Sequence, residues 1–270
     1  MKKYFASKSF LVGFCLIVFF LLLMIAGFFA LPCDPNATDT AHKFARCSAQ
    51  HFFGTDHLGR DIFSRILYGT RISFGIGFIV MIFGCVTGLI LGSVSGYFGG
   101  ALDTIIQKLI TVQMSFPGIL LALMLIAVFG TEIKITIFAL CLMSVPRFTR
   151  ITRASFLKYK NVLFVKSARA RGASHLRIMA VHILPNILPE LLVTCSLSFA
   201  LAILSESGLS YLGLGIQPPT PSFGRMLNDA QRFIFTDPKG VLIPAIFLSS
   251  LVLAFNLLGD GIAETNGQNA

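Results

Sequence analysis

The residues of this chain best suited to chemistry form a short basic stretch at 166–174. Its candidate functional residues are Lys166, Ala168, Arg169, Ala170, Arg171, Gly172 and Ser174. The stretch carries positive charges and no negative ones, and its glycine can end one helix before its serine caps the next. Such an ordered basic segment between apolar runs is typical of a loop that docks a partner. We therefore predict a docking element that binds a protein partner.

No other part of the sequence forms a catalytic or nucleotide-binding set. There is no Gly-x-x-x-x-Gly-Lys phosphate loop and no His-Glu-x-x-His zinc motif. The run 92–96 is not a nucleophile elbow, because Val94 occupies the position where a serine is needed. We therefore predict a chain that is not an enzyme and holds no metal or cofactor. Any energy that it uses must come from a partner.

Composition places the elements around the basic stretch in a membrane. Hydrophobic residues make up 55% of the chain and charged residues only 13%, whereas soluble domains contain about 25% charged residues. The net charge of +10 does not indicate nucleic-acid binding. The basic residues cluster beside apolar runs, as orientation signals do.

About six segments are apolar enough to cross a bilayer, which requires about 20 residues in a helix. The expected spans are 10–31, 72–102, 109–131, a fourth around 135–146, 191–224 and 240–259. The fourth is too short alone, so it must begin before Lys134 or continue past Arg147. The first is too long for the apolar core of a cleaved signal, and we interpret it as a retained anchor. The predicted fold class is an all-α membrane protein.

Basic residues in short loops predict the orientation of the spans. The N-terminus holds Lys2, Lys3 and Lys8, and the segment 147–177 holds nine basic residues and no acid. Four spans separate these segments, so both should lie on the cytoplasmic side. The C-terminus, two spans later, should lie there too, with residues 32–71 and about 215–239 facing outward.

Three features inside the spans each have two interpretations. Four glycines spaced by four between residues 84 and 96 predict either internal packing or a gating or subunit interface. Pro117 should kink its helix, which suits either a path that opens and closes or an irregularity of packing. Glu206 either lines a pathway or makes a helix-end or interhelical hydrogen bond. Pro117 and Glu206 are our candidates for a path through the membrane.

The expected outer loop contains thiol and imidazole groups. Cys33 and Cys47 could form a disulfide on the oxidising side of the membrane. With His42 and His51 they give a Cys-x8-His-x4-Cys-x3-His array, whose spacing matches no tight ligand pattern. We therefore predict no metal here, and a disulfide and free thiols both stay open.

A series of short motifs follows in order along residues 50–262. They are FGTDHLGRD at 53–61, YGTR at 68–71, GYFGG at 96–100 with Asp103, SFP at 115–117, the Gly172-centred loop through LPN at 184–186, LSYLGLG at 209–215, QPPTP at 217–221, Gly224 with Met226 and Leu227, and NLLGDG at 256–261. In these motifs the chain resembles the permease subunits of binding-protein-dependent ABC importers. The similarity is to the second, C-type, permease of the dipeptide/oligopeptide/nickel family.

This resemblance implies a type I ABC importer permease architecture. Residues 1–71 would be an anchor helix with an external loop, and 72–270 the core transmembrane domain with a cytoplasmic coupling loop at about 156–182. The stretch 166–174 corresponds to the family's coupling helix. The implied partners are a second homologous permease, two ATPase subunits that hold ATP and Mg, and a periplasmic or lipid-anchored solute-binding protein. The implied location is the inner (plasma) membrane, and the implied cargo is a dipeptide or oligopeptide, with nickel or another small solute as the alternative.

Two departures from the family pattern concern charge. Lys166 stands where the family usually has glutamate, so either the ATPase carries a compensating acid or this position lies outside the contact. The tail after Gly261 lacks the basic ending common in relatives.

Overall fold

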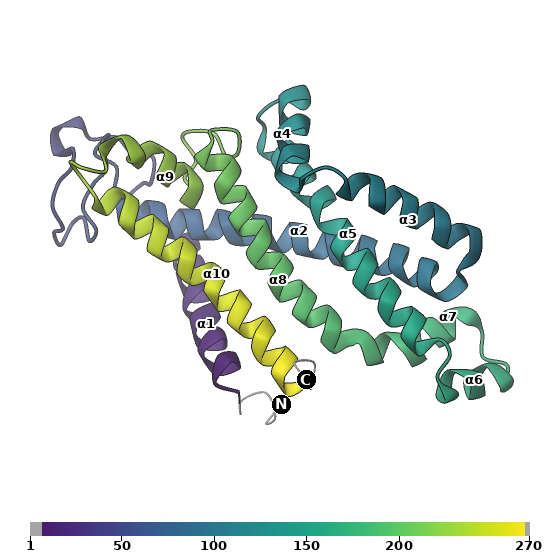
Figure 1. Ribbon diagram of the computed structural model, residues 1–270. Coiled ribbons are helices and arrows are strands. Elements are labelled where there is room, and N and C mark those ends of the chain that lie inside the picture. Colours follow the sequence, from purple (N-terminus) through teal and green to yellow (C-terminus); the bar gives the residue numbers. More distant parts are fainter. Residues whose placement is uncertain (1–6, 268–270) are drawn as a thin grey trace.

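The computed structural model describes residues 7–267, which fold into helices and connecting loops (Figure 1). Up to six segments are long and apolar enough to cross a membrane, if a bent helix pair counts as one. They are α1 (Lys8–Phe29), α2 (Ile62–Phe98), the pair α3 (Gly100–Met114) and α4 (Gly118–Phe129), α5 (Ile133–Tyr159), α8 (Leu184–Tyr211) and α10 (Lys239–Thr265). The shorter elements are η2 (Thr40–His42), α6 (Leu163–Ala170), α7 (His175–Arg177), the π-helical η3 (Ile178–Ile183), α9 (Phe223–Ala230) and η4 (Gln231–Phe233). The predicted all-α membrane fold is confirmed, and Lys2 and Lys3 lie outside the described residues.

Several predicted boundaries were wrong because apolar runs and helices do not end at the same residues. α2 begins at Ile62, where the Asp61 side chain caps it by accepting from the Ser64 N–H group. The predicted domain boundary at 71/72 therefore falls inside a helix. The third span is two helices bent by 81°. The fifth ends at Tyr211 and not at 224, and α9 follows as a separate helix.

The fourth span was the shortest prediction, and the structure extends it at both ends. α5 runs from Ile133 to Tyr159 and therefore contains Arg147, Arg150 and Arg153. The expectation that this span begins before Lys134 or continues past Arg147 is confirmed, and the three arginines, counted in the basic segment 147–177, belong to the helix. Hydropathy alone ends a span at its first charges, whereas the helix continues through them.

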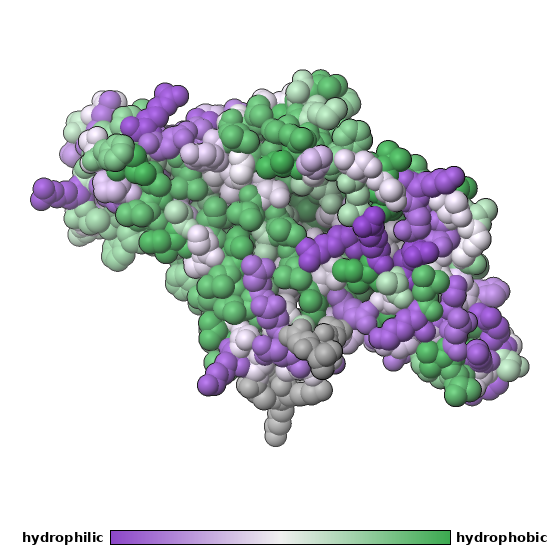
Figure 2. All heavy atoms as spheres, viewed as in Figure 1, coloured by the Kyte–Doolittle hydropathy of each residue, from purple (hydrophilic) through white to green (hydrophobic). Residues whose placement is uncertain are grey.

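Polar surface gathers at two ends of the molecule. Figure 2 shows hydrophobic side chains across the middle, with hydrophilic patches around α9 at one end and around α6 and α7 at the other. Loop 30–61 and α9 share the first end (Figure 1). They are joined there by Arg60, which donates to Asp56 at 2.7 Å and to Asp229 at 3.0 Å. An apolar middle between two polar ends is what a bilayer requires of a spanning protein.

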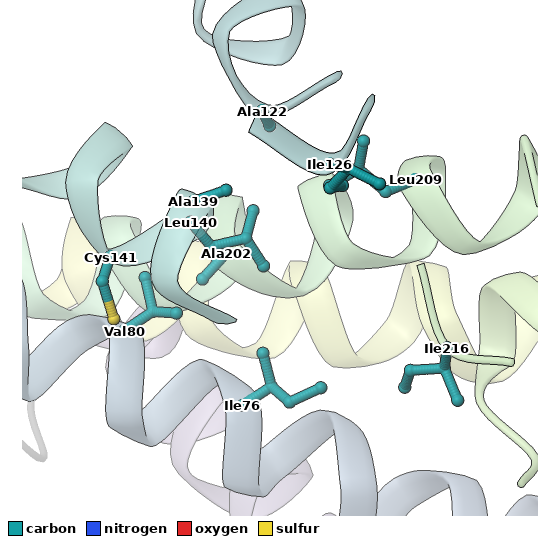
Figure 3. Close-up of a cluster of buried hydrophobic side chains, with 10 residues drawn as sticks. All are labelled: Ile76, Val80, Ala122, Ile126, Ala139, Leu140, Cys141, Ala202, Leu209 and Ile216. Atoms are coloured by element: carbon teal, nitrogen blue, oxygen red, sulfur yellow. The ribbon is translucent and has the colours of Figure 1, made fainter. Parts of the chain in front are cut away.

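The buried apolar core lies between the spans. Figure 3 shows one cluster in which Ile76 of α2, Leu140 of α5 and Ala202 of α8 converge, with Ile126 of α4 beside Leu209. A second cluster joins α1, α2, α8, α9 and α10. α4 thus packs the bent α3–α4 pair against this part of the core.

The glycine stripe of α2 packs against α5. A Cβ atom at Gly92 would lie 2.6 Å from the carbonyl oxygen of Thr149, and one at Gly96 would lie 2.7 Å from that of Arg153. Cβ atoms at Gly84 and Gly88 would approach atoms of α5 just as closely. The stripe therefore allows two backbones to approach, which is the internal-packing interpretation.

We expect Gly92→Leu to destabilise the protein, because the opposing atoms include backbone that cannot move aside. Overpacking costs about 1–3 kcal/mol, which should lower the Tm by about 2–4 °C for each kcal/mol. Gly75→Leu is the matched control, since Gly75 lies on the same helix with nothing within 4 Å of its Cβ position. Thermal unfolding of the detergent-purified protein measures both. Equal Tm values for the two variants would contradict the packing described.

Candidate functional site

The basic stretch forms a helical elbow at the end of the molecule opposite loop 30–61 (Figure 1). Gly172 follows the end of α6 and has a φ of 82°, the left-handed region that glycine adopts most easily. Its N–H group donates to the Arg169 carbonyl at 3.0 Å, and the Ala173 N–H group donates to the Ala168 carbonyl at 3.1 Å. These two bonds define a Schellman motif. The predicted helix-ending role of Gly172 is confirmed.

A second helix begins directly after the turn at Gly172. Ser174 is the N-cap of α7, and its hydroxyl accepts from the Arg177 N–H group at 3.4 Å. α7 continues through the π-helical η3 into α8. The predicted cap is therefore confirmed, and the elbow connects to a membrane span without a flexible linker.

The inward face of α6 is fixed to the ends of three spans. Val165 and Ala168 are buried. They belong to a cluster with Tyr97 of α2, Phe156 of α5, and Ile178, Ile183, Ile187 and Leu191 of η3 and α8. Ala168 therefore faces its own fold, and we correct its assignment as a partner contact: it seats the elbow.

The outward face of the elbow is exposed. The remaining predicted contacts lie there: Lys166, Arg169, Ala170, Arg171, Gly172 and Ser174. Two apolar side chains join them, Leu163 with 80% of its surface exposed and Leu176 with 77%. Our sequence analysis missed both. The helical periodicity of the sequence could have identified Leu163, because this residue does not share the face of α6 that carries Val165 and Ala168.

Tyr97, near the end of α2, ties the elbow to the spans. Its hydroxyl lies 2.9 Å from Nδ1 of His175, and Arg169 Nη2 donates to it at 3.4 Å. The adjacent carbonyl of Gly96 accepts from Lys160 Nζ at 2.9 Å. Movement of the elbow must therefore displace the end of α2 as well.

Ion pairs stiffen the same end of the bundle. Arg153 of α5 makes a bidentate pair with Asp103 of α3, with distances of 2.6 and 2.7 Å. Ser155 of α5 donates to Glu190 of α8, and Lys158 lies 3.8 Å from the same carboxylate. The bidentate geometry fixes the relative orientation of the Arg153 and Asp103 side chains. Together, these contacts link α3, α5 and α8 beside the elbow.

Glu206 is fully buried near the other end of α8. Its carboxylate accepts from Ser210 at 2.7 Å and from Ser207 at 3.4 Å. Ser210 in turn accepts from the Ile216 N–H group at 2.9 Å. Of the two interpretations, this geometry favours the hydrogen-bonding one, because Glu206 lines none of the cavities described below.

Pro117 lies at the break between α3 and α4 and is exposed. It lines a cavity of about 320 Å³ together with Gln113 and Phe116. A second cavity of about 190 Å³ lies against Val80, Ser198 and Ser205. Pro117 thus borders open space, in contrast with Glu206.

The thiols of loop 30–61 do not pair. Cys33 and Cys47 are both free in the structure. The predicted array is also divided, because Cys33 and His51 gather with Asp61 while His42 binds Asp39 instead. His51 Nδ1 lies 3.0 Å from Asp61. Burial, and secondarily Asp61, raise the pKa of the Cys33 thiol.

The described residues thus form a bundle of up to six candidate spans with a helical elbow between two of them. The family described as binding-protein-dependent transport system inner membrane component matches residues 88–267. The chain therefore belongs to this family of multi-pass inner-membrane proteins.

Curated relatives cover nearly the whole chain. The dipeptide transport system permease protein DppC of Haemophilus influenzae is 38% identical over 96% of this chain and 90% of its own length. DppC of Alkalihalophilus pseudofirmus is 36% identical, over 96% of this chain and 85% of that protein. The glutathione transport system permease protein GsiD of Pectobacterium atrosepticum is 38% identical over 92% of this chain and 83% of its own length.

Solved structures share the fold. An inward-facing form of the MetNI methionine ABC transporter aligns with a TM-score of 0.61 at 18% identity, over 74% of this chain and 94% of that chain. At this identity the likeness concerns architecture alone.

Proposed function

We propose that this chain is a permease subunit of an ATP-driven importer that carries peptides across the inner membrane. The observation that carries the proposal is the elbow, which is exposed on one face and anchored to α2, α5 and α8 on the other. Such an element transmits a push from outside the membrane to several spans at once. The chain itself holds no nucleotide-binding motif and is a pore-forming subunit without catalytic residues.

The elbow docks in a groove of an ATPase subunit. Leu163 and Leu176 offer apolar anchors, and Arg169 and Arg171 offer charge to an acidic rim. Exposed apolar residues ringed by charge are typical of protein interfaces. ATP and Mg are held by two ATPase partners, and a second permease completes the pore.

The elbow lies on the cytoplasmic side together with both termini. Loop 30–61 and α9 face outward, where a solute-binding protein delivers cargo. The excess of basic residues over 147–177 supports this orientation, even though part of that segment belongs to α5. Peptide cargo is supported by the relatives' names, which specify dipeptide and glutathione transport.

Reconstitution tests this proposal. Proteoliposomes holding this permease, its partner permease, the two ATPases and the binding protein should accumulate a labelled dipeptide only with internal ATP. Omitting the ATPases should abolish uptake. Uptake driven by the permease pair alone, or uptake dependent on an ion gradient without ATP, would contradict it.

A further inference from the structure

Arg147 has an unusual place among the arginines of the spans. It lies midway along α5, about 20 Å from either helix end at 1.5 Å per residue. An ionised side chain at such depth is costly and marks a functional site by default.

The Arg147 guanidinium has no partner among the residues that the structure describes. It makes no ion pair or hydrogen bond with any residue of 7–267. Arg153, six residues later, is paired with Asp103, and buried Arg65 near the outer end donates to the Pro35 carbonyl. The bundle therefore satisfies those arginines and leaves Arg147 free.

Arg147 borders both cavities described above. The 190 Å³ cavity and the 320 Å³ cavity share Met143 and Arg147 in their linings. Arg147 is also the one charged side chain among the described residues that line either cavity. The hydroxyls of Ser144, Ser198 and Ser205 add further polar groups to the first. The two adjoining spaces are therefore positively charged, and no acidic side chain from residues 7–267 lines them.

A space with one free guanidinium and no acid suits an anion. The planar fork of arginine matches a carboxylate with two parallel hydrogen bonds. We propose that Arg147 binds the terminal carboxylate of the peptide as it passes through the membrane, an inference that rests on the peptide-import function proposed above. The neighbouring break at Pro117 then borders the same route, whereas Glu206 does not.

The test compares a peptide with its amide in the complete reconstituted importer. Ala-Ala and Ala-Ala-amide are supplied bound to the solute-binding protein, and uptake is normalised to the measured loading of that protein. Arg147→Gln should lower uptake of Ala-Ala by about tenfold or more, the scale of one hydrogen bond to a charged group. Uptake of the amide should stay unchanged, and Arg147→Lys should restore part of the loss.

Arg150→Gln is the matched control, because Arg150 is exposed on the same helix and lines neither cavity. It should leave both uptake rates near the wild-type values. An equal fall for both substrates in Arg147→Gln would overturn the inference and indicate that Arg147 pairs with an acid of the second permease. No fall for either would also overturn it. Absence of Ala-Ala uptake by the wild-type importer would instead refute the proposed function.

Discussion

Gly172→Val should reduce ATP-driven uptake by about tenfold or more while the protein still inserts and folds. A valine at a φ of 82° is strained by about 1–2 kcal/mol or more, since β-branched residues rarely adopt positive φ. About 1.4 kcal/mol corresponds to a factor of ten. The Cβ position at Gly172 has nothing within 4 Å, so the strain acts on the turn alone. Uptake by the reconstituted importer measures the effect.

Gly213→Val is a closely matched control. Gly213 has a φ of 81° and no atom within 4 Å of its Cβ position. It ends α8 with the same pair of bonds, Gly213 N–H to the Ser210 carbonyl and Leu214 N–H to the Leu209 carbonyl. Because it lies at the opposite end of α8 from the elbow, it should retain the ATPase partners on co-purification. Gly172→Asn should recover part of the uptake, since asparagine tolerates this conformation.

Equal losses of ATPase binding in Gly172→Val and Gly213→Val would mean that the elbow has no special role. Unchanged uptake in Gly172→Val would mean that the Schellman turn does not transmit force.

Glu206→Ala should destabilise the protein more than any loss of an exposed acid. Removing the buried carboxylate leaves the hydroxyls of Ser210 and Ser207 without their acceptor. Each buried group left unsatisfied costs about 1–3 kcal/mol. Glu206→Gln keeps an acceptor oxygen and should recover most of the loss. The measurement is the Tm of the purified protein in detergent.

Glu264→Ala provides the comparison at the surface. Glu264 is exposed and also accepts from two serine hydroxyls, Ser7 at 2.6 Å and Ser9 at 3.2 Å. Its replacement should change stability by no more than about 0.5 kcal/mol. If Glu206→Ala kept the wild-type Tm but changed which peptides are imported, Glu206 would belong to the translocation path after all.

Local signals in the sequence predicted the elbow well. Glycine and serine have strong, specific backbone roles, so Gly172 as a helix end and Ser174 as a cap could be recognised without knowledge of their surroundings. The same applies to the turn after α2, where Gly99 has a φ of 72°. Composition alone was enough to predict a helical bundle in a membrane.

Features that depend on tertiary partners could not be predicted in this way. Hydropathy indicated that the fourth span extends beyond 135–146 but not where it ends, because a linear scan cannot see that Asp103 pairs with Arg153 or that a cavity faces Arg147. The inward position of Ala168 depended on which face of α6 meets the spans. The hydroxyls of Ser207 and Ser210 lie on the same helix as Glu206, but its complete burial depended on how α8 packs against the rest of the bundle.

Crosslinking from the elbow tests its docking most directly. A photoactivatable maleimide is attached at Leu163→Cys, on the exposed face of α6, in a background where exposed Cys15 and Cys47 are replaced by serine. Phe235→Cys, fully exposed in the segment after η4, serves as the control. Illumination should join Leu163→Cys to an ATPase subunit and leave Phe235→Cys free of it. Labelling of Leu163→Cys from outside intact cells, or crosslinks to the ATPase from Phe235→Cys alone, would contradict the cytoplasmic docking of the elbow.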